Sequence, residues 1–134
     1  MSSNADIVRE AFLAINRGDD ESFLALLDEG VEWHSRTVGI VPASIWRGRD
    51  AVRRGRVEAE ADGRHVITTL QELRSAGNDV LVLGVVTSEQ PHRGRTMLPL
   101  AWIWTVRNGR VTRVESFTGR QSALSAWDAR HVAD

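Results

Sequence analysis

The 134-residue sequence contains no cysteine, no tyrosine and no lysine, and all 17 of its Lys and Arg positions are arginine. Without cysteine the chain has no disulfide, no thiolate metal site and no cysteine nucleophile. Without lysine it cannot form a Schiff base or anchor a pyridoxal cofactor, and without tyrosine it lacks a phenol for an oxyanion. Any proton transfer must therefore use histidine, aspartate or glutamate.

The sequence also lacks a charge excess and long apolar runs. Its 17 basic and 18 acidic residues give a net charge of −1, so we expect no nucleic-acid partner. Residues 1–6 are polar, and no stretch approaches the roughly 18 apolar residues of a membrane span, so we expect no export signal and no membrane partner. The length predicts a single domain over residues 1–134, and without an export signal or anchor we expect it in the cytoplasm.

Four segments show the apolar spacing of amphipathic helices. In the first, apolar residues recur every three or four positions from Ile7 to Ile15, after Ser3, which can cap the helix, and before Gly18, which can end it. Polar capping residues and spaced apolar residues predict the others in the same way. The expected helices run from Ser3 to Gly18, from Asp19 or Asp20 to near Gly30, from Asp50 to Asp62, and from Gln121 to Ala133.

Between and after the helices, apolar and polar residues alternate as in strands. Asn108-Gly109 is a strong hairpin signal, and Pro99, which lacks an N–H group, is expected at a bulge or where the partner strand has ended. Helices followed by antiparallel strands predict an α+β fold in which helices cover one face of a curved sheet. The expected strands are Val31–Ser35, His65–Arg74, Val80–Glu89, Arg95–Arg107 and Arg110–Thr118, with residues 37–47 as an apolar loop folded over the domain.

Five tryptophans are many for this length, and several share one predicted face. Period two in the long strand places Leu98, Leu100, Trp102, Trp104 and Val106 together. A bent sheet with such a face can enclose a small-molecule pocket, although the same rings could simply fill the core. The candidate ligand-binding residues are Phe12, Trp33, Trp46, Trp102, Trp104, Ser116 and Thr118.

Few ionisable groups are candidates for chemistry in such a pocket. Period two places Glu32 and Glu115 on the faces opposite Trp33 and Ser116, which favours outward ion pairs with an arginine such as Arg113 or Arg95. His34 is the one candidate catalytic acid or base, because the expected strand ends there and its unperturbed pKa suits proton transfer; a hydrogen-bonded structural histidine is the alternative. No pair of histidines has helical metal-site spacing, so we expect no metal and no cofactor.

Five segments, "AFLAINRGD", "LLDEGVEWHS", "IWRGRDAVRR", "NDVLVLGVV" and "LAWIWTVRNGRVTRVESFTGRQSALSAW", resemble the SnoaL-like, polyketide cyclase-related branch of the nuclear transport factor 2 (NTF2)-like superfamily. The resemblance covers essentially the whole chain. It implies a cystatin-like cone, with N-terminal helices packed on a strongly curved mixed or antiparallel sheet, and a homodimer formed through the outer sheet face. It leaves function open, because this fold carries cyclases, isomerases, hydrolases, dehydratases and binding proteins.

The resemblance also shows which catalytic groups are missing. In ketosteroid isomerase relatives a tyrosine and a protonated aspartate hold the oxyanion, and a second aspartate moves the proton. The matching positions here are Ala11, Trp102 and Trp33, which have no such chemistry. The aspartate that cyclase and epoxide hydrolase relatives carry after the last strand is also absent from Phe117-Thr118-Gly119.

These observations favour a protein that binds a small, mostly apolar, aromatic or polycyclic metabolite. The alternative is a cofactor-independent cyclase, isomerase or hydratase-type enzyme in which His34 serves as acid or base. A third hypothesis is a structural or regulatory dimer whose tryptophans fill the cone.

Overall fold

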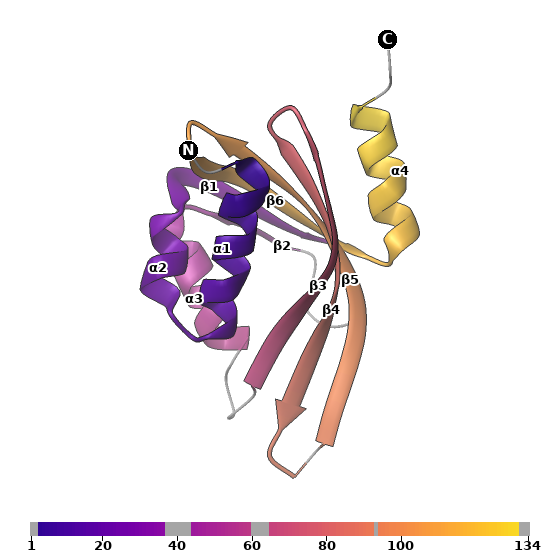
Figure 1. The fold of residues 1–134 in the computed structure, drawn as a ribbon. Coiled ribbons are helices and arrows are strands. Elements are labelled where there is room, and N and C mark those ends of the chain that lie inside the picture. The colour runs from indigo at the N-terminus through magenta and orange to yellow at the C-terminus, as the bar shows by residue number, and fades with distance from the viewer. Residues whose placement is uncertain (1–2, 37–43, 60–64, 93, 132–134) are drawn as a thin grey trace.

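A computed structural model describes residues 3–36, 44–59, 65–92 and 94–131, and these form four helices and a six-stranded sheet. In chain order the elements are α1 (Asn4–Asn16), α2 (Asp20–Ala25), β1 (Leu27–Arg36), β2 (Ser44–Arg47), α3 (Arg49–Ala59), β3 (His65–Ala76), β4 (Asp79–Gln90), β5 (Gly94–Arg107), β6 (Arg110–Thr118) and α4 (Arg120–Arg130). Figure 1 shows α1, α2 and α3 on one side of the sheet, here called the inner face, and α4 on the other, the outer face. The predicted α+β class is confirmed.

The first two helices begin where their capping residues predict. Ser3 and Asp6 form a reciprocal capping box on α1, and the Asp19 carboxylate accepts the backbone N–H of Ser22 on α2. The prediction that the second helix continues to near Gly30 is wrong. It ends at Ala25 because the next residues join the sheet, where Leu27 is fully buried.

Strand β1 is therefore longer than the predicted strand Val31–Ser35. It pairs in parallel with β6 and antiparallel with β2, so the sheet is mixed, in the order β2-β1-β6-β5-β4-β3. The prediction of a loop over residues 37–47 is wrong for its last four residues, because residues 44–47 form strand β2. In this strand Trp46 lies opposite Trp33 of β1. Residues 37–43 lie outside the described residues.

The two remaining helices differ slightly from their predicted ranges. Helix α3 begins at Arg49, so Asp50 lies in its first turn instead of capping it, and its predicted end at Asp62 lies outside the described residues. Helix α4 ends at Arg130, short of Ala133, since His131 leaves the helical conformation. No helix of the described residues is long and apolar enough to span a membrane.

The four β-hairpin strands form the predicted meander, and Pro99 lies where the sequence predicts. The β5–β6 pairing ends at Leu100 opposite Thr118, so Pro99 needs no N–H group on that side. Alternate residues of β4 point to different faces: Val80 and Val82 join the inner core, and Leu81 and Leu83 pack with Trp127 of α4. The first half of β4 is thus buried on both faces, as its run of valine and leucine predicts.

The sheet bends where β3 and β4 approach closely. The β3–β4 register shifts between Leu70 and Glu72, which leaves Gln71 as a bulge. Opposite this bulge, a Cβ atom on Gly84 would lie 2.6 Å from the Thr69 carbonyl oxygen and 3.5 Å from the Trp102 ring. Only glycine fits between the neighbouring strand and the indole, so this position fixes the curvature of the inner face.

The edge strand β3 is tied to α1 by one side chain. The Asn16 amide donates to the Thr68 carbonyl oxygen at 2.8 Å and accepts the Thr68 N–H at 2.9 Å. The amide therefore pairs with β3 as a neighbouring strand would, and it fixes the end of α1 against the sheet.

We predict that Gly84→Ala lowers the free energy of unfolding by about 1–3 kcal/mol, because the added methyl group overlaps a backbone oxygen. Denaturant unfolding measures this change. Gly30→Ala is the matched control, since its Cβ would meet only the Asp28 carboxylate, at 3.4 Å. Equal stability of Gly84→Ala and the wild type would contradict the proposed close approach.

Candidate functional site

The inner face carries a cluster of aromatic rings, here called the aromatic cluster. Phe12 of α1 contacts Trp102 and Trp104, with ring centroids 5.2 and 5.1 Å apart. Trp33 of β1 lies 5.5 Å from Trp104 and 6.4 Å from Trp46 of β2. The predicted ligand-binding aromatic residues are therefore gathered into one group by four different elements.

The local structure explains how these rings meet. Trp102 and Trp104 are two residues apart on β5, so they share a face, and Phe12 packs against both. Trp33 lies opposite Val114 of β6, which itself lies opposite Trp104. Phe23 of α2 adds a ring 6.2 Å from Trp33. The sequence analysis assigned Phe23 only to the apolar side of its helix, because helical spacing does not show which ring reaches a strand.

Burial changes along the aromatic cluster. Trp104, Phe12 and Trp102 expose 0%, 3% and 6% of their surface, whereas Trp33 and Trp46 are only half-buried. The deep end therefore packs as core, and the end at Trp33 and Trp46 reaches solvent. The two hypotheses, that the rings fill the core or that they line a ligand pocket, therefore apply to different rings of the aromatic cluster.

An apolar surface continues from Trp102 along the inner face. Leu98, Leu100 and Val86 are apolar, half-buried and on the same face as Trp102. In Figure 1 the lower parts of β3, β4 and β5 extend beyond the helices that cover the rest of this face. An apolar surface adjoining Trp102 is thus left partly uncovered by the described helices.

Trp46 is held in place from behind by α3. A Cβ atom on Gly55 would lie 2.8 Å from two carbons of the Trp46 ring, so the indole packs directly on the helix backbone. The absence of a side chain at Gly55 allows the half-exposed ring to remain close to Trp33. This contact makes Trp46 a rigid wall at the open end.

Few polar groups adjoin the aromatic cluster. Ser116 is 4% exposed and lies opposite Trp102, and Thr118 is exposed and lies opposite Leu100. The Trp104 Nε1 atom is buried without a hydrogen-bond partner among the described residues. An indole N–H and hydroxyl groups can orient a ligand oxygen, but none of them is an acid or base at neutral pH.

The structure places His34 away from the aromatic cluster. It lies opposite Glu115, which lies opposite Ile103 of the outer-face core. Its Nε2 atom lies 2.8 Å from Glu32 Oε1, and this hydrogen bond lowers the pKa of Glu32. His34 is therefore separated from the rings by the sheet, and its catalytic role stays a prediction.

The outward ion pairs predicted for Glu32 and Glu115 are present. Glu115 is 2% exposed and accepts ion pairs from Arg113, at 3.1 Å, and from Arg130. Glu32 lies 4.0 Å from Arg47 in addition to its bond with His34. The predicted partner Arg95 instead lies beside Glu89.

Metal ligands are not gathered at either face of the sheet in the part of the chain that the structure describes. Within residues 3–36, 44–59, 65–92 and 94–131, no group of three or more His, Asp or Glu side chains is arranged to hold a metal ion.

Comparisons with known proteins give a family and a fold. A family model described as a SnoaL-like domain matches residues 8–114. No match is found among curated proteins. An NTF2-like protein of unknown function from Burkholderia pseudomallei is 23% identical, with a TM-score of 0.75 over 99% of this chain and 100% of that one.

Two further solved structures carry ligands. TerC, co-crystallized with polyporic acid, is 21% identical, with a TM-score of 0.73 over 93% of this chain and 97% of that one. A protein with a ketosteroid isomerase-like fold from Catenulispora acidiphila, in complex with trimethylamine, is 16% identical, with a TM-score of 0.73 over 92% of each chain. At these identities the likeness shows the fold.

We predict that Glu32→Gln lowers the thermal midpoint slightly at pH 7 and that this difference shrinks as the pH falls below the ordinary glutamate pKa of about 4.3. The folded-state pKa of Glu32 is lowered, so its stabilising effect is present above the unfolded-state pKa and is lost as the pH falls through the folded value. Thermal unfolding of both proteins from pH 3 to 7 measures the effect. Glu10→Gln on the exposed side of α1 is the control, and an equal response of both variants would contradict the role of the His34 bond.

Proposed function

This chain belongs to the SnoaL-like domain family, and from that premise we propose that its aromatic cluster binds a small, mostly apolar, aromatic or polycyclic metabolite. The observation that carries the proposal is the change in burial along the rings, from fully buried Trp104 to half-exposed Trp33 and Trp46. A ligand ring stacked on the exposed indoles would continue the aromatic packing outward.

The chemistry of the surrounding wall supports an uncharged ligand. The residues that adjoin the rings on the inner face are apolar or carry hydroxyl groups, including Leu98, Leu100, Ser116 and Thr118. A charged ligand would lose its hydration without gaining an ion pair there. Flat apolar molecules lose little on transfer into such a surface and gain contact with several rings.

The hydroxyl groups on the inner face suggest one polar feature of the ligand. Thr118 is exposed and lies opposite Leu100, and Ser116 lies opposite Trp102. A hydroxyl group can donate a hydrogen bond to a ligand oxygen. We infer a ligand with a carbonyl or hydroxyl oxygen at the edge of an aromatic ring system.

The neighbours and the missing acid groups support binding ahead of turnover. TerC, of the same fold, was co-crystallized with polyporic acid. The enzymatic alternative, a cyclase, isomerase or hydratase-type reaction with His34 as acid or base, would need a substrate on the outer face, where His34 bonds Glu32. A turnover assay of His34→Gln separates the two, since turnover by the wild type that is lost in this variant would favour the enzyme.

We also infer that the protein is a cytoplasmic homodimer associated through the outer face of β3, β4 and β5. Met97 is 61% exposed there, beside a shallow cavity of about 150 Å³ lined by His65, Ile67, Thr69, Thr87, Glu89 and Arg95. An exposed apolar side chain such as Met97, surrounded by polar residues, favours association. Light scattering during size-exclusion chromatography tests the assembly, and Met97→Asp is expected to shift a dimer toward monomer.

We predict that 2-naphthol and anthraquinone quench the tryptophan fluorescence saturably. Trp46→Ala is expected to weaken binding about ten-fold, because it removes the ring at the open end. Trp127→Phe is the matched control, since Trp127 lies in the outer-face core and should leave the affinity unchanged.

Two outcomes of this titration would contradict the proposal. Linear, non-saturating quenching by both compounds would show that the rings only fill the core. Equal losses of affinity in Trp46→Ala and Trp127→Phe would place the binding elsewhere or show a general loss of fold.

A further inference from the structure

Strand β1 makes an excursion from the sheet near its start. Leu27 pairs with Val111 and Glu32 with Arg113, so residues 28–31 of β1 lie opposite the single residue Thr112 of β6. Irregularities of this kind redirect side chains and are frequent beside functional sites. The excursion lies at the α2–β1 junction and contains no residue of the aromatic cluster.

Hydrogen bonds fix both ends of the excursion to the start of α3. The Gly48 N–H donates to the Val31 carbonyl oxygen at 2.8 Å. Arg49 donates to the Leu27 carbonyl oxygen through Nε at 2.9 Å and Nη2 at 2.7 Å. The backbone is therefore held in this shape by the fold.

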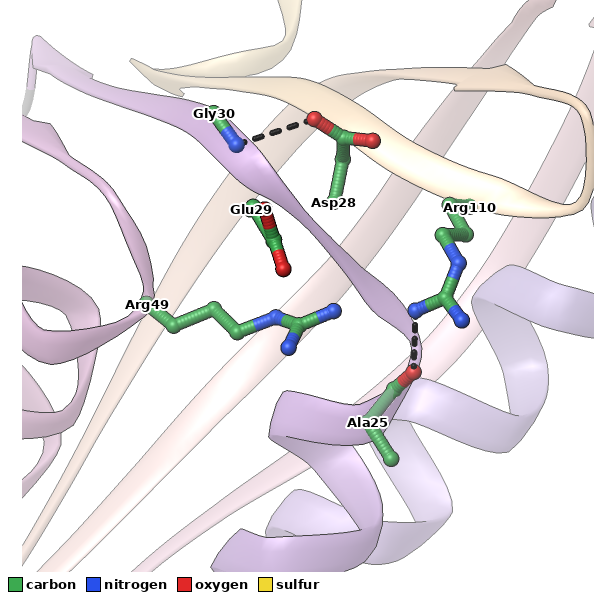
Figure 2. A pocket seen from close by; sticks show the side chains of 6 residues that line it. All are labelled: Ala25, Asp28, Glu29, Gly30, Arg49 and Arg110. Atoms are coloured by element: carbon green, nitrogen blue, oxygen red, sulfur yellow. Dashed lines mark hydrogen bonds between the residues drawn. The ribbon is translucent and has the colours of Figure 1, made fainter.

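A cavity of about 660 Å³ lies against the excursion. Figure 2 shows Arg49 of α3 and Arg110 of β6 reaching toward one another from the two sides of β1. The lining residues are Ala25, Asp28, Glu29, Gly30, Arg49 and Arg110. Two cations and two anions thus line one cavity of zero net formal charge.

Both guanidinium groups are anchored on backbone carbonyls and keep unused donors. Arg110 donates from Nη1 to the Ala25 carbonyl oxygen at 3.3 Å, and Arg49 uses Nε and Nη2 on Leu27. A guanidinium group carries five N–H donors, so each arginine retains several for a ligand. Anchoring reduces the freedom that an arginine must lose on binding.

The two carboxylates are likewise not paired with these arginines. Asp28 accepts the Gly30 N–H at 2.9 Å, and Glu29 is exposed. In the described part of the chain, no ion pair within 4.0 Å joins Asp28 or Glu29 to Arg49 or Arg110. Opposite charges are therefore presented to one cavity at separations greater than 4.0 Å.

We propose that this cavity, here called the charged basin, binds a small zwitterion, such as an amino acid, with its carboxylate on Arg49 and Arg110 and its ammonium group on Asp28 and Glu29. A dianion would gain from the arginines but be repelled by both carboxylates. A metal ion or an amine would be attracted by the two carboxylates but repelled by both arginines. A zwitterion long enough to reach both sets of charges would pair its carboxylate with the arginines and its ammonium group with the carboxylates.

The test uses zwitterions of increasing charge separation: L-alanine, β-alanine and 4-aminobutyrate. Acetate and methylammonium, which each carry one of the two charges, are the reference compounds. Binding is followed by ¹H–¹⁵N NMR at the Gly30 amide and the arginine Nε groups. We expect at least one zwitterion to bind saturably, with a Kd on the order of 1 mM, and at least ten-fold more tightly than either reference compound.

Two variants assign this binding to the charged basin. Arg110→Gln and Glu29→Gln change exposed side chains and are each expected to weaken binding about ten-fold with the other amide signals unchanged. Arg107→Gln, an exposed arginine outside the cavity, is the matched control and should bind as the wild type does.

Three results would overturn the proposal. The first is a lack of saturation by all three zwitterions up to about 100 mM, which would leave no meaningful affinity. The second is acetate or methylammonium binding as tightly as the best zwitterion. The third is unchanged affinity in both Arg110→Gln and Glu29→Gln. Because the aromatic cluster contributes no residue to the charged basin, none of these results bears on the proposed aromatic ligand.

Discussion

The close approach of β3 to β4 at Gly84 is the constraint from which the shape of the inner face follows. A side chain there would overlap the Thr69 carbonyl oxygen, so the bulge at Gln71 and the bend depend on glycine. The Trp102 ring lies over the same position, which places the aromatic row against the bend. Curvature and aromatic packing are therefore set by one backbone contact.

The sheet also separates two kinds of chemistry. Its inner face carries the rings and hydroxyl groups, and its outer face beside β1 carries the ion pairs of Glu32 and Glu115. Because side chains alternate along each strand, neighbouring residues such as Trp33 and His34 serve different faces. The inner face therefore presents ring surfaces and hydroxyl groups, and the ion pairs of Glu32 and Glu115 lie on the other side of the sheet.

Local signals predicted much of this arrangement. Capping residues placed the starts of α1 and α2, Asn108-Gly109 placed the last hairpin, and period two placed Trp102 and Trp104 on one face and Glu115 on the other. The parallel β1–β6 pairing, β2 and the early end of α2 could not be predicted, since they depend on contacts between distant residues. The charged basin could not be predicted from the sequence either, because Arg49 and Arg110 come together only in the folded chain.

The amide of Asn16 has a consequence beyond fixing α1. Strand β3 is an edge of the sheet, and its unpaired backbone groups are a template on which another polypeptide could add a strand. The Asn16 amide bonds the N–H and carbonyl groups of Thr68, so these two backbone groups cannot pair with an added strand. The side chain that ends the first helix thus also removes one pair of backbone groups to which an added strand could bind.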